Sequence, residues 1–194
     1  MKCVTVLGAF ILFASCVYAQ QGSVINKHKE IVHYPASIIK TSDSTVKIDE
    51  RVILYNKNLQ PFINSLKLSS LTESYKLDRI PDFIKSFLKQ LSNDQFTIAN
   101  PGKAWNCCCD RNDSIPNRAL ICHGSDKNLF FMTYLTGGVG ESEHLILIRY
   151  KDDTIVDFWA GTLSGHLSSK NAIVQYLIRN KNKHWGLNSN ILTI

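Results

Sequence analysis

The feature that most constrains the fold is a series of apolar runs, separated by short turn signals, between Arg118 and Gly161. The runs RALICHG, NLFFMTYLTGG and EHLILIRYKDDTIVDFWAG are rich in β-branched and aromatic residues, which favour strands. Lys151-Asp152-Asp153 is typical of a tight hairpin turn, and Gly137 to Gly140 of a looser one. Consecutive strands joined by short turns pair as an antiparallel meander. The sequence therefore predicts such a sheet.

Apolar residues at helical spacing occur on both sides of this stretch. Residues 78–94 carry one apolar stripe, with Asp78 as a candidate N-cap; its members are Phe83, Ile84, Phe87, Leu88 and Leu91. Residues 168–183 return to the same spacing after Ser168 and Ser169. The segment LQPFINSLKL, residues 59–68, is predicted as a short helix that begins at Pro61.

These elements together indicate an α+β domain, in which helices pack on one face of a curved antiparallel β-meander. We expect residues 45–56, TVKIDERVILYN, to add a strand or hairpin, and residues 190–194, NILTI, to add an edge strand. Cystatin-like and NTF2-like folds have this general look. The analogy is one of pattern, and a fold does not determine a function.

Residues 1–19 have the three parts of a secretory signal peptide. Lys2 supplies the positive charge, Val4 to Val17 is almost wholly apolar, and a small-x-small cleavage sequence ends at Ala19. The apolar run is shorter than the roughly 20 residues that a spanning helix needs, and no later segment is apolar enough to be one. We therefore expect a secreted or periplasmic protein without a transmembrane segment.

Phe13 to Cys16 also resembles a lipobox, but phenylalanine fits its first position poorly, so we expect ordinary cleavage rather than lipidation of Cys16. A loose N-terminal arm is then expected over residues 20–44 and a single domain over residues 45–194. The chain has 22 basic and 16 acidic residues, and its lysines are scattered without interleaved aromatics. This pattern argues against a nucleic-acid partner, and no cofactor fingerprint occurs in the sequence.

Four cysteines follow the signal peptide, and three of them are adjacent: Cys107, Cys108 and Cys109. Exported proteins commonly pair their cysteines. A bond between neighbours is strained, because their Cα atoms are about 3.8 Å apart. We therefore expect one disulfide from Cys122 to a member of the triplet. The remaining thiols would stay free, form a strained bond or pair with another chain.

Two alternatives for the same region stay open. Cys107, Cys109, Cys122 and His123 form a candidate zinc set, but their spacing is not that of paired zinc knuckles, so we favour no metal. The sequence Asn112-Asp113-Ser114 is a glycosylation sequon, which has meaning only in a host that glycosylates.

His144 and Asp157 are candidate catalytic residues, and their relation depends on the register of the hairpin that turns near Asp152. A two-residue turn places both side chains on one face, where a buried carboxylate near a histidine could act in acid–base catalysis. A three-residue turn shifts the register by one residue and pairs Asp157 with Arg149 as a structural ion pair. Sequence alone leaves both registers open, and we favour the structural one.

No catalytic motif in the chain rises above chance matches. We therefore expect a non-catalytic binding or interaction module, such as an inhibitor, an immunity-type protein or a small-ligand binder. The alternative is a small hydrolase-like or isomerase-like enzyme that uses His144 and Asp157 in a pocket between sheet and helices.

Overall fold

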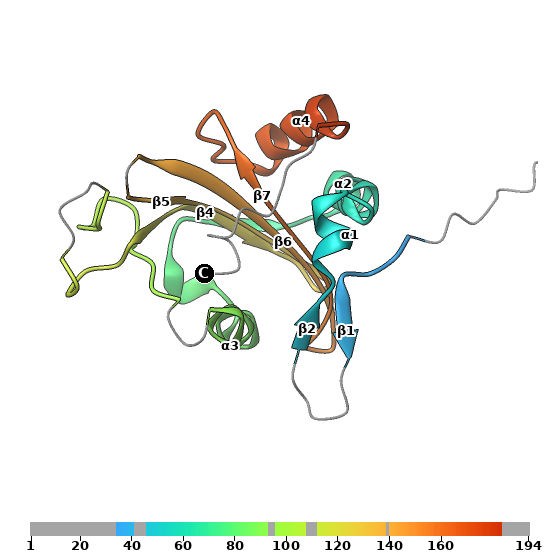
Figure 1. The fold of residues 1–194 in the computed structure, drawn as a ribbon, viewed down its shortest axis with the longest axis horizontal. Helices are drawn as coiled ribbons and strands as arrows, with labels where there is room; N and C mark the ends of the chain where they lie inside the picture. The colour runs from blue at the N-terminus through green and yellow to red at the C-terminus, as the bar shows by residue number, and fades with distance from the viewer. Residues whose placement is uncertain (1–33, 41–45, 93–95, 108–111, 139, 184–194) are drawn as a thin grey trace, which may run out of the picture. The chain divides into compact units, whose positions relative to one another are not determined.

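Five strands form one antiparallel sheet, and strands that follow one another in the chain are neighbours in it (Figure 1). In order they are β3 (Thr72–Ser74), β4 (Arg118–Ser125), β5 (Leu129–Thr136), β6 (Ser142–Lys151) and β7 (Thr154–Leu163). In this computed structural model the sheet is open, and β3 and β7 are its outer strands. The predicted α+β class and the antiparallel meander are confirmed.

The structure describes residues 34–40, 46–92, 96–107, 112–138 and 140–183. They all belong to one unit that spans residues 33–194. The predicted signal peptide at residues 1–19 and the predicted edge strand at residues 190–194 lie outside the described residues. Among the helices that are described, none is long and apolar enough to cross a membrane.

The turn between β6 and β7 has the geometry that a tight hairpin needs. Asp152 and Asp153 form it, with φ angles of +48° and +59°. Left-handed residues at both central positions match the right-handed twist of the flanking strands, and aspartate tolerates this conformation better than most residues. The predicted turn at these residues is confirmed.

Helices cover both faces of the sheet, so the prediction that they pack on one face is wrong. Phe158 and Trp159 are neighbours in β7 and point to opposite faces. The ring of Phe158 contacts the ring of Phe87 in α3 (Asp82–Leu91), with the ring centroids 5.7 Å apart. On the other face, the Trp159 indole donates a hydrogen bond to Asn56, which lies between α1 and α2, at 3.0 Å.

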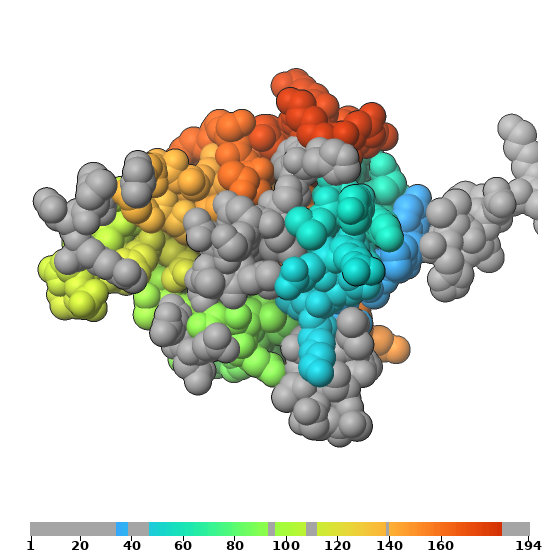
Figure 2. Space-filling model, viewed as in Figure 1, coloured from blue at the N-terminus to red at the C-terminus, as the bar shows by residue number. Residues whose placement is uncertain are grey.

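The second face carries three helices: α1 (Glu50–Leu54), α2 (Leu59–Leu68) and α4 (Lys170–Asn180). Helix α4 lies beside α2, and their surfaces adjoin in the space-filling view (Figure 2). The reason for two covered faces is the composition of the strands, since β4, β5 and β6 are apolar at consecutive positions rather than at alternate ones. A strand of this kind must be buried on both sides.

Regular structure begins earlier in the chain than predicted. β1 (Ile38–Lys40) pairs with β2 (Val46–Ile48) in a second, two-stranded sheet. Ser37 is fully buried, and its backbone N–H donates to Asp157 at 2.9 Å. The C-terminal end of the predicted loose arm is therefore part of the folded domain, because its polar groups satisfy a buried carboxylate of β7.

For residues 45–56 we predicted a strand or hairpin, and the described part, residues 46–56, contains a strand followed by a helix. β2 ends at Ile48, and α1 begins at Glu50. The change occurs at Asp49, whose side chain accepts a hydrogen bond from the backbone N–H of Arg51 at 3.0 Å. This capping interaction satisfies an end group of the helix and overrides the local strand preference.

The two helices predicted next in the chain are confirmed, with different first residues. Helix α2 occupies residues 59–68, but Pro61 is its third residue rather than its first. Helix α3 begins at Asp82, after Pro81, and Asp78 lies in the preceding 3₁₀ turn η1 (Leu77–Arg79) instead of capping the helix.

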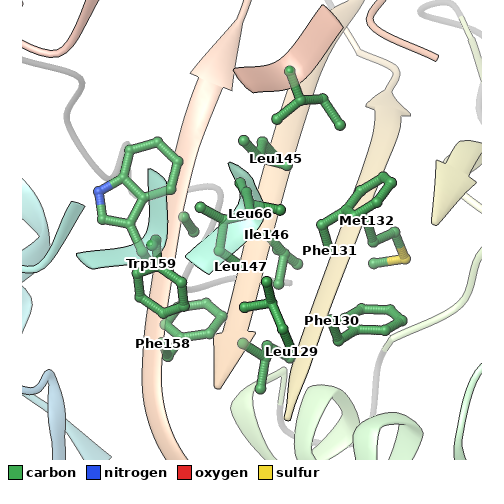
Figure 3. Packing of buried hydrophobic residues seen from close by; sticks show 14 of the residues in the cluster. Leu66, Leu129, Phe130, Phe131, Met132, Leu145, Ile146, Leu147, Phe158 and Trp159 are labelled. Carbon is green, nitrogen blue, oxygen red and sulfur yellow. The ribbon is translucent and has the colours of Figure 1, made fainter. Parts of the chain in front are cut away.

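Two aromatic side chains of the core, Trp159 and Phe131 (Figure 3), lie close to glycines of the sheet. Trp159 is fully buried, and a Cβ placed on Gly161 would lie 2.4 Å from the Cη2 atom of its ring. A Cβ placed on Gly124 would likewise lie 2.4 Å from the Cε1 atom of Phe131. Both positions therefore need glycine for close packing rather than for an unusual φ angle.

The variant Gly161→Ala should be destabilised by about 1–3 kcal/mol, because the new methyl group would force the buried indole out of its position. Urea denaturation followed by circular dichroism measures this change. The matched control is Gly140→Ala, since nothing lies within 4 Å of a Cβ at Gly140. Equal stability of the two variants would show that the indole moves at little cost.

Candidate functional site

Asp157 is a buried carboxylate that is surrounded by hydrogen-bond donors. Its exposed fraction is 1%. Oδ1 accepts from the side-chain amide of Asn58 at 2.7 Å and from the backbone N–H of Ser37 at 2.9 Å. Oδ2 forms an ion pair with the guanidinium of Arg149. A buried charge with this many partners is satisfied, and removing the carboxylate would leave its donors and the guanidinium unpaired.

The register of the β6–β7 hairpin combines the two predicted alternatives. The turn has two residues, so Lys151 pairs with Thr154. The register then shifts by one residue, which leaves Val156 as an extra residue and pairs Arg149 with Asp157. This arrangement is a β-bulge. The bulge, rather than a three-residue turn, produces the ion pair between Asp157 and Arg149.

His144 is buried in a separate cluster of polar and aromatic side chains. Its ring stacks on Tyr134, with the ring centroids 5.2 Å apart, and Nε2 lies 2.8 Å from the hydroxyl of Thr136. Nδ1 is buried without a hydrogen-bond partner among the described residues. Burial lowers the pKa of His144 to about 4, and the positive charge of Arg118 acts in the same direction. The imidazole is therefore neutral at pH 7.

The structure does not bring His144 and Asp157 together. His144 pairs with Thr162 and Asp157 with Arg149 in the β6–β7 register. Positions 157 and 162 of β7 have opposite parity and therefore point to opposite faces of the sheet. The predicted acid–base pair would need both side chains on one face.

Cys122 has a buried thiol inside the fold. Sγ lies 3.3 Å from the hydroxyl of Thr133 and 3.8 Å from the carbonyl oxygen of Leu167. Burial raises the pKa of the Cys122 thiol to about 11, against a smaller opposite effect of the Thr133 hydrogen bond. A protonated, inaccessible thiol of this kind is a poor nucleophile.

No disulfide joins Cys107 and Cys122, the two cysteines that the structure describes, so the predicted bridge is not formed between these two. Cys107 is exposed, whereas Cys122 is fully buried against its neighbours in the sheet. The side chain of Cys122 is thus occupied by packing within the domain. Cys108 and Cys109 lie outside the described residues.

The residues proposed for zinc do not converge either. Cys122 and His123 are consecutive in β4 and point to opposite faces. His123 Nε2 donates to the carbonyl oxygen of Lys76 at 2.9 Å, and its ring stacks on Phe130. Within the described part of the chain no three histidine, cysteine or acidic side chains gather as metal ligands. Cys109 is outside that part.

The glycosylation sequon lies in an exposed loop that Asn106 organises. The Asn106 amide donates to the carbonyl oxygen of Asn112 at 2.8 Å, and its Oδ1 accepts from the Asn112 backbone N–H at 2.9 Å. The Asn112 side chain accepts in turn from the hydroxyl of Ser114 at 2.6 Å. Asn112 is exposed, and an acceptor asparagine must be accessible.

An apolar cavity of about 390 Å³ lies between α3 and the segment 96–98. Its lining combines six apolar side chains with one threonine and two lysines; these residues are Leu77, Ile80, Lys85, Leu88, Lys89, Phe96, Thr97, Ile98 and Pro116. Small-molecule sites are typically concave, mostly apolar and roughly 300–1,000 Å³ in volume. This cavity has the properties of such a site.

Phe96 joins this cavity to the buried cluster around His144. The ring of Phe96 lines the cavity and contacts the ring of Tyr134, with the centroids 6.4 Å apart. The Arg118 guanidinium lies over the same ring, 5.5 Å from its centroid. The cavity therefore ends at an aromatic wall, and the polar cluster lies behind it.

A second cavity, of about 420 Å³, lies where β6 begins and β7 ends. Its lining includes Glu143, Thr162 and His166. The carboxylate of Glu143 accepts from the backbone N–H groups of His166 and Leu167, both at 2.6 Å. Its charge therefore holds the loop after β7 in place, which makes this cavity the weaker candidate for a ligand site.

Sequence reasoning did not find the first cavity. Lys85, Leu88 and Lys89 lie in the predicted helix, and the other lining residues come from the turn around Leu77, the segment 96–98 and Pro116. A signal did exist, because Phe96 and Ile98 alternate with polar neighbours and Leu77 and Ile80 lie three residues apart. Each pair indicates that its own segment has one apolar side. Neither pair indicates that the two segments come together beside α3.

No protein-family model, no curated protein and no solved structure matches this chain. The candidate site is therefore argued from its geometry.

The variant Asp157→Ala should lose about 3 kcal/mol of stability, because it leaves Arg149 and the buried amide of Asn58 without their acceptor. Urea denaturation measures the loss. The control is Asp82→Ala, which removes an exposed carboxylate paired with Lys85 at 2.9 Å and should change stability much less. A similar loss for the two variants would contradict the structural role of Asp157.

His144 should make the protein less stable in acid. Its pKa is about 4 in the folded state, below the ordinary value of 6.5, so the unfolded chain binds the proton more readily. The stabilisation is complete above about pH 6.5 and is lost as the pH falls towards 4, at no more than about 1.4 kcal/mol per pH unit. Free energies of unfolding between pH 7.5 and 4.5 measure this slope.

The variant His144→Gln should reduce that slope, and His166→Asn, at an exposed position, should leave it unchanged. Some slope will remain in His144→Gln, because burial also lowers the pKa of His123. The same slope in His144→Gln and the unmodified protein would refute this assignment.

Proposed function

We propose that this protein is an exported, non-catalytic binding module that takes a small apolar ligand in the cavity beside α3. The observation that carries the proposal is the cavity itself, with a volume of about 390 Å³ and a largely apolar lining. Burying the apolar surface of a ligand there would supply the main driving force, roughly 25 cal/mol for each Å² removed from water.

The shape of the surroundings supports this choice among binding functions. Leu88 and Ile80 are buried and supply a rigid floor, whereas Thr97 and Lys89 are exposed at the rim. A rigid apolar floor with an open rim suits a molecule small enough to enter. The likeness to cystatin-like and NTF2-like folds rests on the order of elements alone and adds no ligand.

Export is the second part of the proposal, and it rests on residues 1–19. The positive Lys2, the apolar run from Val4 to Val17 and the cleavage sequence ending at Ala19 support it. A ligand-binding module outside the cytoplasm would meet its ligand as a dilute small molecule. Lipidation of Cys16 remains the alternative to ordinary cleavage.

The alternative proposal, a hydrolase-like or isomerase-like enzyme, has less support. His144 and Asp157 point to opposite faces of the sheet, and Asp157 is held by Ser37, Asn58 and Arg149 in contacts that stabilise the fold. The buried thiol of Cys122 is held protonated by its raised pKa. The Thr136 hydroxyl does lie 2.8 Å from Nε2 of His144, but no described residue hydrogen-bonds to Nδ1 to orient the imidazole as a base.

The binding proposal is tested with N-phenyl-1-naphthylamine, an uncharged probe that fluoresces in apolar sites. We expect saturable binding to the unmodified protein. The variant Thr97→Trp should weaken it at least about tenfold, because the indole would occupy the cavity from its rim.

The matched control is Asn64→Trp, which adds the same side chain at an exposed position of α2, on the other face of the sheet. Its affinity should equal that of the unmodified protein. Absence of saturable binding, or equal binding by Thr97→Trp, would overturn the proposal. Thermal melts of both variants confirm that each is folded.

A further inference from the structure

Both charged residues in the lining of the α3 cavity are lysines. Lys85 and Lys89 belong to α3 and are four residues apart, so they project from the same side of the helix. Among the residues that the structure describes, no acidic side chain lines the cavity. The opening of this apolar cavity therefore carries two positive charges.

Neither lysine has a strong partner among the described residues. Lys85 pairs with Asp82 at 2.9 Å, but the two side chains are 40% and 95% exposed. Exposed pairs of this kind contribute little, and water competes for the ammonium group. No ion pair is found for Lys89 in the described part of the chain. Both ammonium groups can turn towards a ligand at little cost.

The spacing of the lysines also disfavours the helix slightly. Like charges at positions i and i+4 repel each other and destabilise a helix by a few tenths of a kcal/mol in isolated peptides. An anion between Lys85 and Lys89 would remove this repulsion. The interior of the cavity offers the opposite environment, because Leu88, Phe96 and Ile98 give a charged group no partner.

We propose that the ligand is an apolar organic anion, such as an aryl or alkyl carboxylate or sulfonate. Its hydrocarbon part enters the cavity, and its acidic group stays at the rim between Lys85 and Lys89. This inference rests on the proposed binding function and adds the charge of the ligand to it.

The experiment compares two probes with the same ring system. N-phenyl-1-naphthylamine is uncharged, and 1-anilinonaphthalene-8-sulfonate carries one negative charge. The unmodified protein should bind the sulfonate about five times more tightly than the amine at low salt, through two exposed charge contacts. The preference should disappear in roughly 1 M salt, where the Debye length is about 3 Å.

The double variant Lys85→Gln/Lys89→Gln should lose the preference for the sulfonate, so that it binds the two probes with similar affinity. The control Lys67→Gln/Lys181→Gln removes the same charge from exposed positions in α2 and after α4 and should keep the preference. Thr97→Trp should weaken the binding of both probes at least about tenfold, which excludes probe bound elsewhere.

The outcomes separate the two proposals. Equal affinity for the two probes, or a preference that survives in Lys85→Gln/Lys89→Gln, would overturn the anion inference and leave the binding function standing. Binding of neither probe would overturn the binding function and the inference together. If the control Lys67→Gln/Lys181→Gln loses the preference equally, the preference comes from the net charge of the protein. This result would also overturn the inference.

Discussion

The buried carboxylate of Asp157 is the interaction on which the arrangement of the rest depends. It accepts hydrogen bonds from Ser37, before β1, and from Asn58, before α2, and it pairs with Arg149 of β6. A carboxylate removed from water is costly unless such partners surround it. Three separate parts of the chain therefore have to meet at one point of β7, and the bulge at Val156 is what turns the carboxylate towards them.

The two covered faces divide the domain by chemistry. One face holds the Asp157 carboxylate and the buried thiol of Cys122, and both groups have hydrogen-bond partners within the protein. The other face holds the neutral imidazole of His144 and, beyond the ring of Phe96, a cavity with an apolar lining. Polar groups that stabilise the fold are thus kept apart from the place where a ligand would enter.

Local signals made much of the fold predictable, and tertiary contacts decided the remainder. The turn at Asp152 and the stripe containing Phe87 depend on neighbours in sequence, so pattern alone predicted them. The one-residue shift at Val156 depends on satisfying Asp157 from distant segments, and no local pattern encodes it. Sequence did not show that the thiol of Cys122 packs against Thr133 and Leu167, and a bridge from it to Cys108 or Cys109 stays a prediction. The cavity lined by Phe96 forms where the segment 96–98 and the turn around Leu77 come together beside α3. The sequence pattern does not show that these segments meet.

The contact between Ser37 and Asp157 has a consequence for the order of folding. The two residues are 120 positions apart in the chain, whereas the strands of the meander pair with their immediate neighbours. Closing a loop of that length costs more entropy than closing a hairpin, so the meander is expected to assemble first. The segment that is synthesised before all of these strands then docks after them. Until it docks, the Asp157 carboxylate of β7 stays in contact with water and lacks its hydrogen bond from Ser37.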